Sequence, residues 1–269
     1  MPAEGDGDPD MSEFVLSKIE IEETAATIAA EREYLASAVD AIKAARREIE
    51  RKIRKDDFFL TTLEPYEPSE DDGRVVRRMC DAAREAGVGP MATVAGTIAQ
   101  EALDAMISGG CTHCWVDNGG DVALRITSPV TMEVFHEPGS ETAFALELEP
   151  VDKVFGVCTS SGTLGHSISF GNSDVALAIA DSAPLADALA TAIGNRVTDV
   201  TSLRTCFDPF RSVKGFTAGL VMVNGAVSMH GRLPRLVEVE HNPERLTAHS
   251  KMSTPEFIGP YDKARKVRA

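Results

Sequence analysis

One segment, which we expect to be helical, carries oxygen-bearing side chains at a spacing that suits cation binding. Ser182 followed by Pro184 favours a helix start, because serine caps a first turn and proline fits its first positions. Asp187, Thr191 and Asn195 follow at four-residue steps, so their carboxylate, hydroxyl and amide oxygens lie along one face. The opposite face is apolar and is expected in the core: Leu185, Leu189 and Ile193.

Oxygens in this arrangement suit a hard cation. Mg²⁺ takes one or two protein oxygens and keeps its other positions for water and substrate phosphates. Two alternatives need no metal: Asp187 lies in solvent, or Thr191 bonds back to a carbonyl of the preceding helical turn. Short motifs of this kind also match by chance, so the pattern leaves these readings open.

A loop rich in small polar residues precedes this helix and favours phosphate binding. Its residues are Thr159, Ser160, Ser161, Gly162 and Thr163, closed by Gly165-His166-Ser167. Such a loop leaves backbone N–H groups free to point at phosphate oxygens. Together with the oxygen face of the helix, it predicts a Mg²⁺–phosphate site. Between the two, residues 174–180 are expected to form a short buried strand.

Two further motifs have plainer interpretations. The run from Asp117 to Asp121 (DNGGD) is typical of a turn between strands, because paired glycines accept the positive φ angles of a tight hairpin. Cys111 and Cys114 have C-x-x-C spacing, but no second cysteine pair or downstream histidine pair completes a zinc set. Buried structural thiols are therefore favoured over zinc or redox chemistry.

Hydrophobic periodicity and turn residues predict the elements that position these motifs. Helices are expected over residues 31–54, 70–86 and 92–107. Gly96, inside the third, costs roughly 1 kcal/mol against alanine and predicts a close packing or binding contact. Strands are expected as two pieces within 13–29, at 114–117, as an antiparallel meander of 122–127, 130–136 and 142–148, and as a hairpin within 217–239 around Asn224-Gly225. Residues 197–216 give no clear pattern.

Composition narrows the class of protein. A net charge of −15, from 42 acidic and 27 basic residues, argues against a nucleic-acid-binding surface, which needs a basic stripe. There is no run of about 18 apolar residues for a membrane span, and the acidic N-terminus lacks the features of a signal peptide. Five sparse cysteines fit reduced thiols, so a cytoplasmic location is expected. We expect a disordered tail at 1–11, one domain over 12–242 and a polar extension at 243–269.

Three of the motifs stand in the order found in the ApbE-like superfamily. They are Asn118–Asp121, Gly156–Gly162 with His166 downstream, and Ala186–Thr191. The chain resembles this superfamily over roughly residues 20–240, and more closely a shorter, uncharacterised prokaryotic branch of it. Its best-known members are FAD:protein FMN transferases. The resemblance implies an α+β fold of antiparallel sheets flanked by helices, with a T-fold-like architecture.

The resemblance also implies an activity and a set of site residues. The transferases bind FAD, use Mg²⁺ and move FMN onto a threonine hydroxyl of a partner protein. Carried over, Asp187 and Thr191 would hold the metal with a backbone carbonyl of Ala95, and His166 would act as the base. The dinucleotide would face the turn and the loop: Asn118, Gly119, Gly120, Asp121, Thr159, Ser160, Ser161, Gly162 and Thr163.

The sequence departs from the transferase pattern at two points. The transferases usually carry H-I-I-D-P-x-T-G at the central histidine, whereas residues 166–172 here are HSISFGN. The usual Lys-Gly before the family's first-domain helix is Ala95-Gly96 here. A cation and an acidic partner that would serve flavin binding are therefore missing. Three hypotheses follow: an enzyme acting at a flavin or other nucleotide pyrophosphate by transfer or hydrolysis, a non-catalytic flavin- or nucleotide-binding protein, and a structural protein that reuses the fold.

Overall fold

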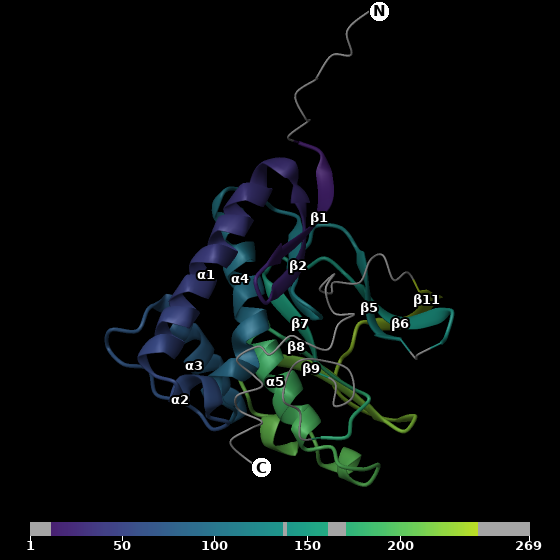
Figure 1. Ribbon diagram of the computed structural model, residues 1–269. Helices are drawn as coiled ribbons and strands as arrows, with labels where there is room; N and C mark the ends of the chain where they lie inside the picture. The colour runs from purple at the N-terminus through teal and green to yellow at the C-terminus, as the bar shows by residue number, and fades with distance from the viewer. Residues whose placement is uncertain (1–11, 137–138, 161–170, 242–269) are drawn as a thin grey trace, which may run out of the picture.

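The fold has three layers. The computed structural model describes residues 12–136, 139–160 and 171–241. Helices cover one face of an eight-stranded antiparallel sheet, and a three-stranded antiparallel sheet packs on the other face (Figure 1). The α+β class predicted from the sequence is confirmed. The expected tail at 1–11 and extension at 243–269 lie outside the described residues.

The large sheet has the strand order β1-β2-β3-β4-β7-β8-β9-β10. Strands β4, β7 and β8 are buried on both faces, because they have helices on one side and the small sheet on the other. Asn224 and Gly225 have φ angles of 50° and 73° and form the predicted two-residue turn between β9 and β10. The strands are β1 Phe14–Ile21, β2 Thr24–Glu31, β3 Cys114–Asp117, β4 Asp121–Arg125, β7 Phe155–Ser160, β8 Val175–Ala180, β9 Phe216–Val223 and β10 Ala226–Gly231.

The predicted helices are confirmed to within a few residues. They are α1 Leu35–Lys55, α3 Arg74–Ala86, α4 Val94–Ser108 and α5 Ala183–Asn195, with a short α2 at Phe58–Thr61 and 3-10 turns η1 Arg32–Tyr34, η2 Pro90–Thr93, η3 Ser202–Arg204 and η4 Asp208–Phe210. Gly87 ends α3 at φ +69°, the left-handed conformation that glycine adopts most readily. In the part of the chain that the structure describes, none of the helices combines the length and apolarity that crossing a bilayer requires.

The small sheet corrects one prediction. Its order is β11-β6-β5, with β5 at Val130–His136, β6 at Thr142–Leu148 and β11 at Arg235–Glu240. We expected β4, β5 and β6 to form one meander, but β4 pairs with β3 and β7. Both edges of β4 are therefore occupied, and the chain crosses to a second layer before β5 begins. Alternation of residue types along a strand does not reveal which neighbour each edge takes.

Two apolar cores hold the layers together. The larger lies between the helices and the sheet, and the smaller lies between the two sheets. Helix α5 is the most enclosed of the helices, since every residue from Ala183 to Gly194 is buried. Its apolar residues Leu185, Leu189 and Ile193 are in the core as predicted.

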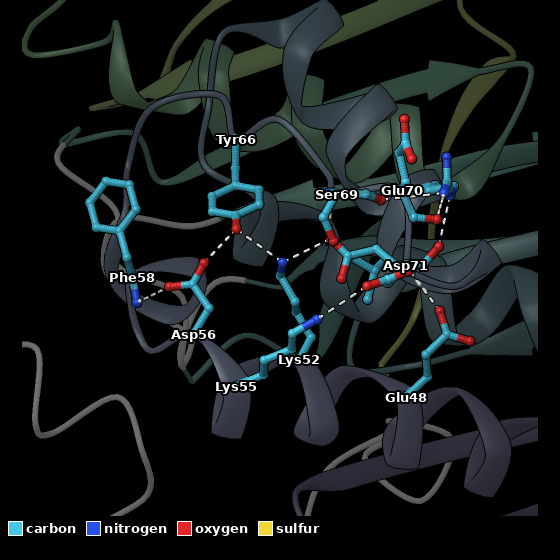
Figure 2. A network of polar contacts seen from close by, with 12 residues as sticks. Glu48, Lys52, Lys55, Asp56, Phe58, Tyr66, Ser69, Glu70 and Asp71 are labelled. Atoms are coloured by element: carbon cyan, nitrogen blue, oxygen red, sulfur yellow. Dashed lines mark hydrogen bonds and ion pairs between the residues drawn. The ribbon is translucent and has the colours of Figure 1, made fainter.

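A buried ion pair ties α1 to the segment before α3 (Figure 2). Lys52 Nζ donates to Asp72 Oδ2 at 2.8 Å and to the Tyr66 hydroxyl at 2.9 Å, and that hydroxyl donates to Asp56. The side chains of Lys52 and Asp72 are only 5% and 6% exposed. Burial opposes the charge on Asp72, but the hydrogen bonds from Lys52 and Ser69 outweigh it and lower the pKa of this carboxyl. The pair thus remains charged inside the fold.

Replacing Lys52 by methionine is expected to destabilise the protein by about 3–5 kcal/mol, because Asp72 would stay buried without its counter-ion. Urea denaturation followed by the fluorescence of Trp115, the single tryptophan, measures the change. Lys55→Met is the matched control, since Lys55 is 63% exposed and faces an exposed Asp71, and it is expected to cost less than about 0.5 kcal/mol. Equal losses of unfolding free energy in both variants would show that the Lys52–Asp72 ion pair is not buried.

Candidate functional site

The starts of α4 and α5 meet at Gly96. A Cβ atom at this position would lie 2.5 Å from the carbonyl oxygen of Ala183 and 2.9 Å from Asp187 Cβ. Only glycine permits this approach, so the close contact expected for Gly96 is confirmed. Gln100, one turn further along α4, accepts a hydrogen bond from the Ala183 N–H at 3.1 Å. The two helix starts are thereby fixed relative to each other.

Asp187 points into this junction. Its Oδ2 accepts a hydrogen bond from the Gly96 N–H at 2.9 Å. Gly96 is the third residue of α4, so the carboxylate satisfies one of the N–H groups that a helix start leaves unpaired. The side chain is only 8% exposed, which shows that the alternative of a solvated Asp187 was wrong. Thr191, one turn further along α5, is also buried at 6%.

The turn between β3 and β4 reaches the same helix start. Asn118 Nδ2 donates to the carbonyl oxygen of Ala95 at 3.1 Å. Gly119 and Gly120 have φ angles of 71° and 98°, as a tight hairpin requires, and the Gly120 N–H donates to Asp117 Oδ1 at 2.9 Å. The predicted hairpin turn is confirmed. The amide of Asn118 is therefore held against the carbonyl that the sequence analysis offered as a metal ligand.

Asp121 begins β4 and is a second buried carboxylate beside Asp187. It is 9% exposed, and its fully buried Oδ1 has no hydrogen-bond partner among the residues that the structure describes. Burial and repulsion from Asp187 raise the pKa of Asp121 well above its ordinary value. Burial also raises the pKa of Asp187 to about 7, although the hydrogen bond from Gly96 acts in the opposite direction. Both shifts arise because this enclosed junction solvates negative charge poorly.

The described part of the phosphate-type loop supports the turn. The N–H and the hydroxyl of Thr159 both donate to the Gly120 carbonyl oxygen, at 3.1 and 3.2 Å. Ser160 is buried, and no described residue hydrogen-bonds to its Oγ. The other predicted loop residues, and the predicted base, lie outside the described residues: Ser161, Gly162, Thr163 and His166.

The structure therefore gathers Ala95, Asn118, Asp121 and Asp187 from three segments distant in sequence: α4, the β3–β4 turn with the start of β4, and α5. Sequence reasoning missed Gln100 and Cys158. Cys158 Sγ contacts the Ala183 carbonyl oxygen at 3.4 Å, and burial together with Asp121 and Asp187 raises the pKa of this thiol. Gln100 could have been found from the sequence. It stands four residues after Gly96 in a predicted helix, so both lie on the same face of α4. Cys111 and Cys114 are buried free thiols outside this cluster.

The chemistry of these donors fits a hard divalent cation. Asp121 Oδ1 is unpaired, and in the part of the chain described no lysine or arginine forms an ion pair with Asp121 or Asp187. A cation held by these carboxylates would remove the repulsion between them. Within the same residues, no group of three or more His, Cys, Asp or Glu side chains is arranged to hold a metal. A cation here would therefore rely on hydroxyl, backbone and substrate oxygens as well.

Comparison with known proteins establishes the family to which this chain belongs. The family described as AbpE bacteria has a model that matches residues 12–206. The chain belongs to this family. A UPF0280 protein of Methanocella arvoryzae is 45% identical over 231 residues, covering 86% of this chain and 94% of that protein. A UPF0280 protein of Archaeoglobus fulgidus is 39% identical over 235 residues, covering 86% and 97%. The resemblance read from the three motifs is confirmed.

Solved structures show the same fold. The flavin transferase ApbE from Vibrio cholerae matches with a TM-score of 0.52 at 13% identity, covering 81% of this chain and 96% of that one. The ApbE protein from Thermotoga maritima matches with a TM-score of 0.53 at 14% identity, covering 81% and 97%. At such identities the likeness establishes the fold and leaves the chemistry to the site itself.

Gly96→Ala is expected to destabilise this AbpE-family chain by about 1–3 kcal/mol, because the added methyl group would overlap Ala183 and Asp187. Helix propensity alone predicts the opposite, a gain of about 1 kcal/mol. Thermal and urea denaturation measure whether Gly96→Ala raises or lowers the stability of the protein. Ser108→Ala, at the exposed end of α4, serves as the control and is expected to change stability by less than about 0.5 kcal/mol. A more stable Gly96→Ala protein would show that the junction is loosely packed.

Asp187→Asn is expected to stabilise the metal-free protein at pH 8 more than at pH 5. A carboxyl whose folded pKa is raised to about 7 favours folding most below about pH 4, and this contribution is lost as the pH rises toward 7. Asparagine does not ionise and can still accept from Gly96, so the stability difference should grow by roughly 2 kcal/mol between pH 5 and pH 8.

Urea denaturation in EDTA at both pH values measures this difference. Asp181→Asn, an exposed aspartate just before α5 that pairs with Lys153, is the control. A difference between Asp187→Asn and the parent that does not vary with pH would refute the raised pKa.

Proposed function

We propose that this protein is a Mg²⁺-dependent enzyme acting on the pyrophosphate of FAD or a related nucleotide. It would transfer FMN to a threonine hydroxyl of a partner protein, or to water. The observation that carries the proposal is the convergence of Asp187, Asp121 and the Ala95 carbonyl at the start of α4. The likeness in fold to the flavin transferase ApbE from Vibrio cholerae supports FAD as the substrate class of this proposal.

Each residue of the junction has a distinct task in this proposal. Asp187 gives one oxygen to Gly96 and keeps the other for the cation. Asn118 donates to the Ala95 carbonyl oxygen, which is the third protein ligand in this proposal. Thr191 would add its hydroxyl oxygen from the next turn of α5. Bound at these oxygens, Mg²⁺ would polarise the phosphoryl oxygens and neutralise the charge that develops on them.

The small-residue turn and loop would hold the dinucleotide. A Cβ on Gly119 would have no neighbour within 4 Å, so a phosphate oxygen could approach the backbone at this residue. Thr159 keeps the turn closed by donating twice to Gly120. His166 remains the candidate for the base that takes the proton of the attacking hydroxyl, a role that requires an imidazole free near neutral pH.

Incubation of the protein with FAD and MgCl₂ should release AMP, with FMN appearing free or on an added threonine-bearing acceptor. Asp187→Asn should lower the rate at least about a hundredfold, because it removes the charged ligand of the cation. Chromatography of FMN and AMP measures this, and EDTA should abolish product formation. Asp181→Asn, with the same chemical change at an exposed site, should retain the parental rate.

The enzyme proposal fails if the parent and Asp187→Asn are equally inert with FAD and with other common dinucleotides. The departures at Ala95 and after His166 favour a second candidate, a protein that binds a flavin or nucleotide without turnover. Thermal denaturation separates the two. FAD at a hundredfold excess over Kd should stabilise a binding protein by about 2.7 kcal/mol, without releasing FMN or AMP.

A further inference from the structure

The starts of α4 and α5 are joined by two hydrogen bonds that mirror each other. The Gly96 N–H of α4 donates to Asp187 Oδ2 of α5 at 2.9 Å. The Ala183 N–H of α5 donates to Gln100 Oε1 of α4 at 3.1 Å. In each helix the accepting side chain stands four residues after the donating N–H, about one helical turn further along. Each helix therefore supplies the cap of the other.

These exchanged bonds replace the local caps that helices usually have. Among the described residues, neither Thr93 before α4 nor Ser182 before α5 forms a side-chain cap hydrogen bond, although this position commonly caps the first turn. The exchanged bonds satisfy backbone N–H groups that a helix start otherwise leaves unpaired. The contact of Gly96 with Ala183 stops the helices from coming closer, and the two bonds stop their starts from separating.

Gln100 is oriented from the far side of its amide group. The residue is 4% exposed, and its Nε2 donates to Asp104 Oδ1 at 2.9 Å. Asp104 is paired in turn with Arg78 of α3 at 2.7 Å. An ionised carboxylate only accepts hydrogen bonds, so it holds the NH₂ group of the amide toward Asp104 and the amide oxygen toward Ala183.

The spacing of the two helix starts matters because the ligands of the proposed cation come from both. The Ala95 carbonyl belongs to α4 and the Asp187 carboxylate belongs to α5, so the distance between them changes if the starts move apart. Mg²⁺ requires near-octahedral geometry with oxygens at about 2.0–2.1 Å, whereas Ca²⁺ accepts flexible arrangements at about 2.3–2.6 Å. A rigid junction therefore favours Mg²⁺, and a loosened junction loses that preference.

We propose that Gln100 is a positioning residue that makes this junction select Mg²⁺ over Ca²⁺. It acts by holding the start of α5, and with it Asp187, at a fixed distance from the Ala95 carbonyl. Replacing groups that orient metal ligands typically costs about 10–100-fold in metal affinity. The selectivity rests on the proposed function, whereas the coupling between the two hydrogen bonds does not.

Hydrogen exchange in the metal-free full chain, followed by NMR, tests the coupling. Gln100→Met keeps the length of the side chain but cannot accept from Ala183. The Ala183 and Gly96 amides should both exchange at least about tenfold faster than in the parent, relative to the amides of α1. Gly96 is the deciding position, since the substitution leaves the partner of its amide in place. Unchanged exchange at Gly96 would overturn the proposal.

Displacement of bound Mn²⁺ by Mg²⁺ or Ca²⁺, followed by EPR spectroscopy, tests the selectivity. Gln100→Met should weaken Mg²⁺ binding at least about tenfold and Ca²⁺ binding less than about threefold. Asp104→Leu removes the group that orients the amide and leaves Gln100 in place, so it should shift the selectivity in the same direction by a smaller factor. Ile42→Val is the control, because it alters the apolar core and should leave the ratio of the two affinities unchanged.

The proposal would be overturned if Gln100→Met weakened Mg²⁺ and Ca²⁺ binding by the same factor, or if Ile42→Val shifted their ratio equally. A parent protein that binds Mn²⁺ while Gln100→Met keeps the parental selectivity overturns this inference alone. A parent protein that does not bind Mn²⁺ overturns the proposed metal site together with it. The two failures are therefore distinguishable.

Discussion

Two buried carboxylates in one junction constrain the rest of this molecule. Asp121 and Asp187 lie in an enclosed junction where negative charge is poorly solvated, and each carboxyl has a raised pKa as a result. Such an arrangement costs free energy unless a cation or protons neutralise it. The surrounding fold therefore has to hold the two groups together against their repulsion. Buried carboxyl groups with raised pKa values, which lower the stability of the fold, are typical of functional sites.

Close packing provides that restraint. Helix α5 is fixed at both ends by glycines that bring backbones together. At its start, a Cβ on Gly156 would lie 2.4 Å from Ala183 Cα, and at its end a Cβ on Gly171 would lie 1.9 Å from the Gly194 carbonyl oxygen. Alanines fill much of the space between, so α5 is buried on all sides. The helix that carries Asp187 and Thr191 consequently has little freedom to move away from α4.

Much of this could be predicted from the sequence, because local chemistry determines it. The start of α5 follows from Ser182 and Pro184, the β3–β4 turn from Gly119-Gly120, and the β9–β10 turn from Asn224-Gly225. The order of three motifs also sufficed to identify the family. Each of these signals is contained within a few neighbouring residues.

The features that escaped prediction depend on contacts between distant segments. Residue pattern places β5 in a strand but cannot show that β4 already has two neighbours. Asp121 was assigned to the dinucleotide by the family resemblance, and only the fold shows that it is buried where the charge of Asp187 raises its pKa. Gln100 and Cys158 have ordinary sequence contexts, and their roles come from meeting Ala183. The roles of Thr191 and His166 remain predictions.

The most direct test of the central claim is a crystal structure of the protein soaked with FAD and Mn²⁺, which stands in for Mg²⁺ and gives an anomalous signal. The account predicts one anomalous peak within about 2.5 Å of an Asp187 carboxylate oxygen and of the Ala95 carbonyl oxygen, with the FAD phosphates completing its coordination. A peak elsewhere with FAD bound, or a junction in which Asp187 contacts only Gly96 at saturating metal and FAD, would contradict it.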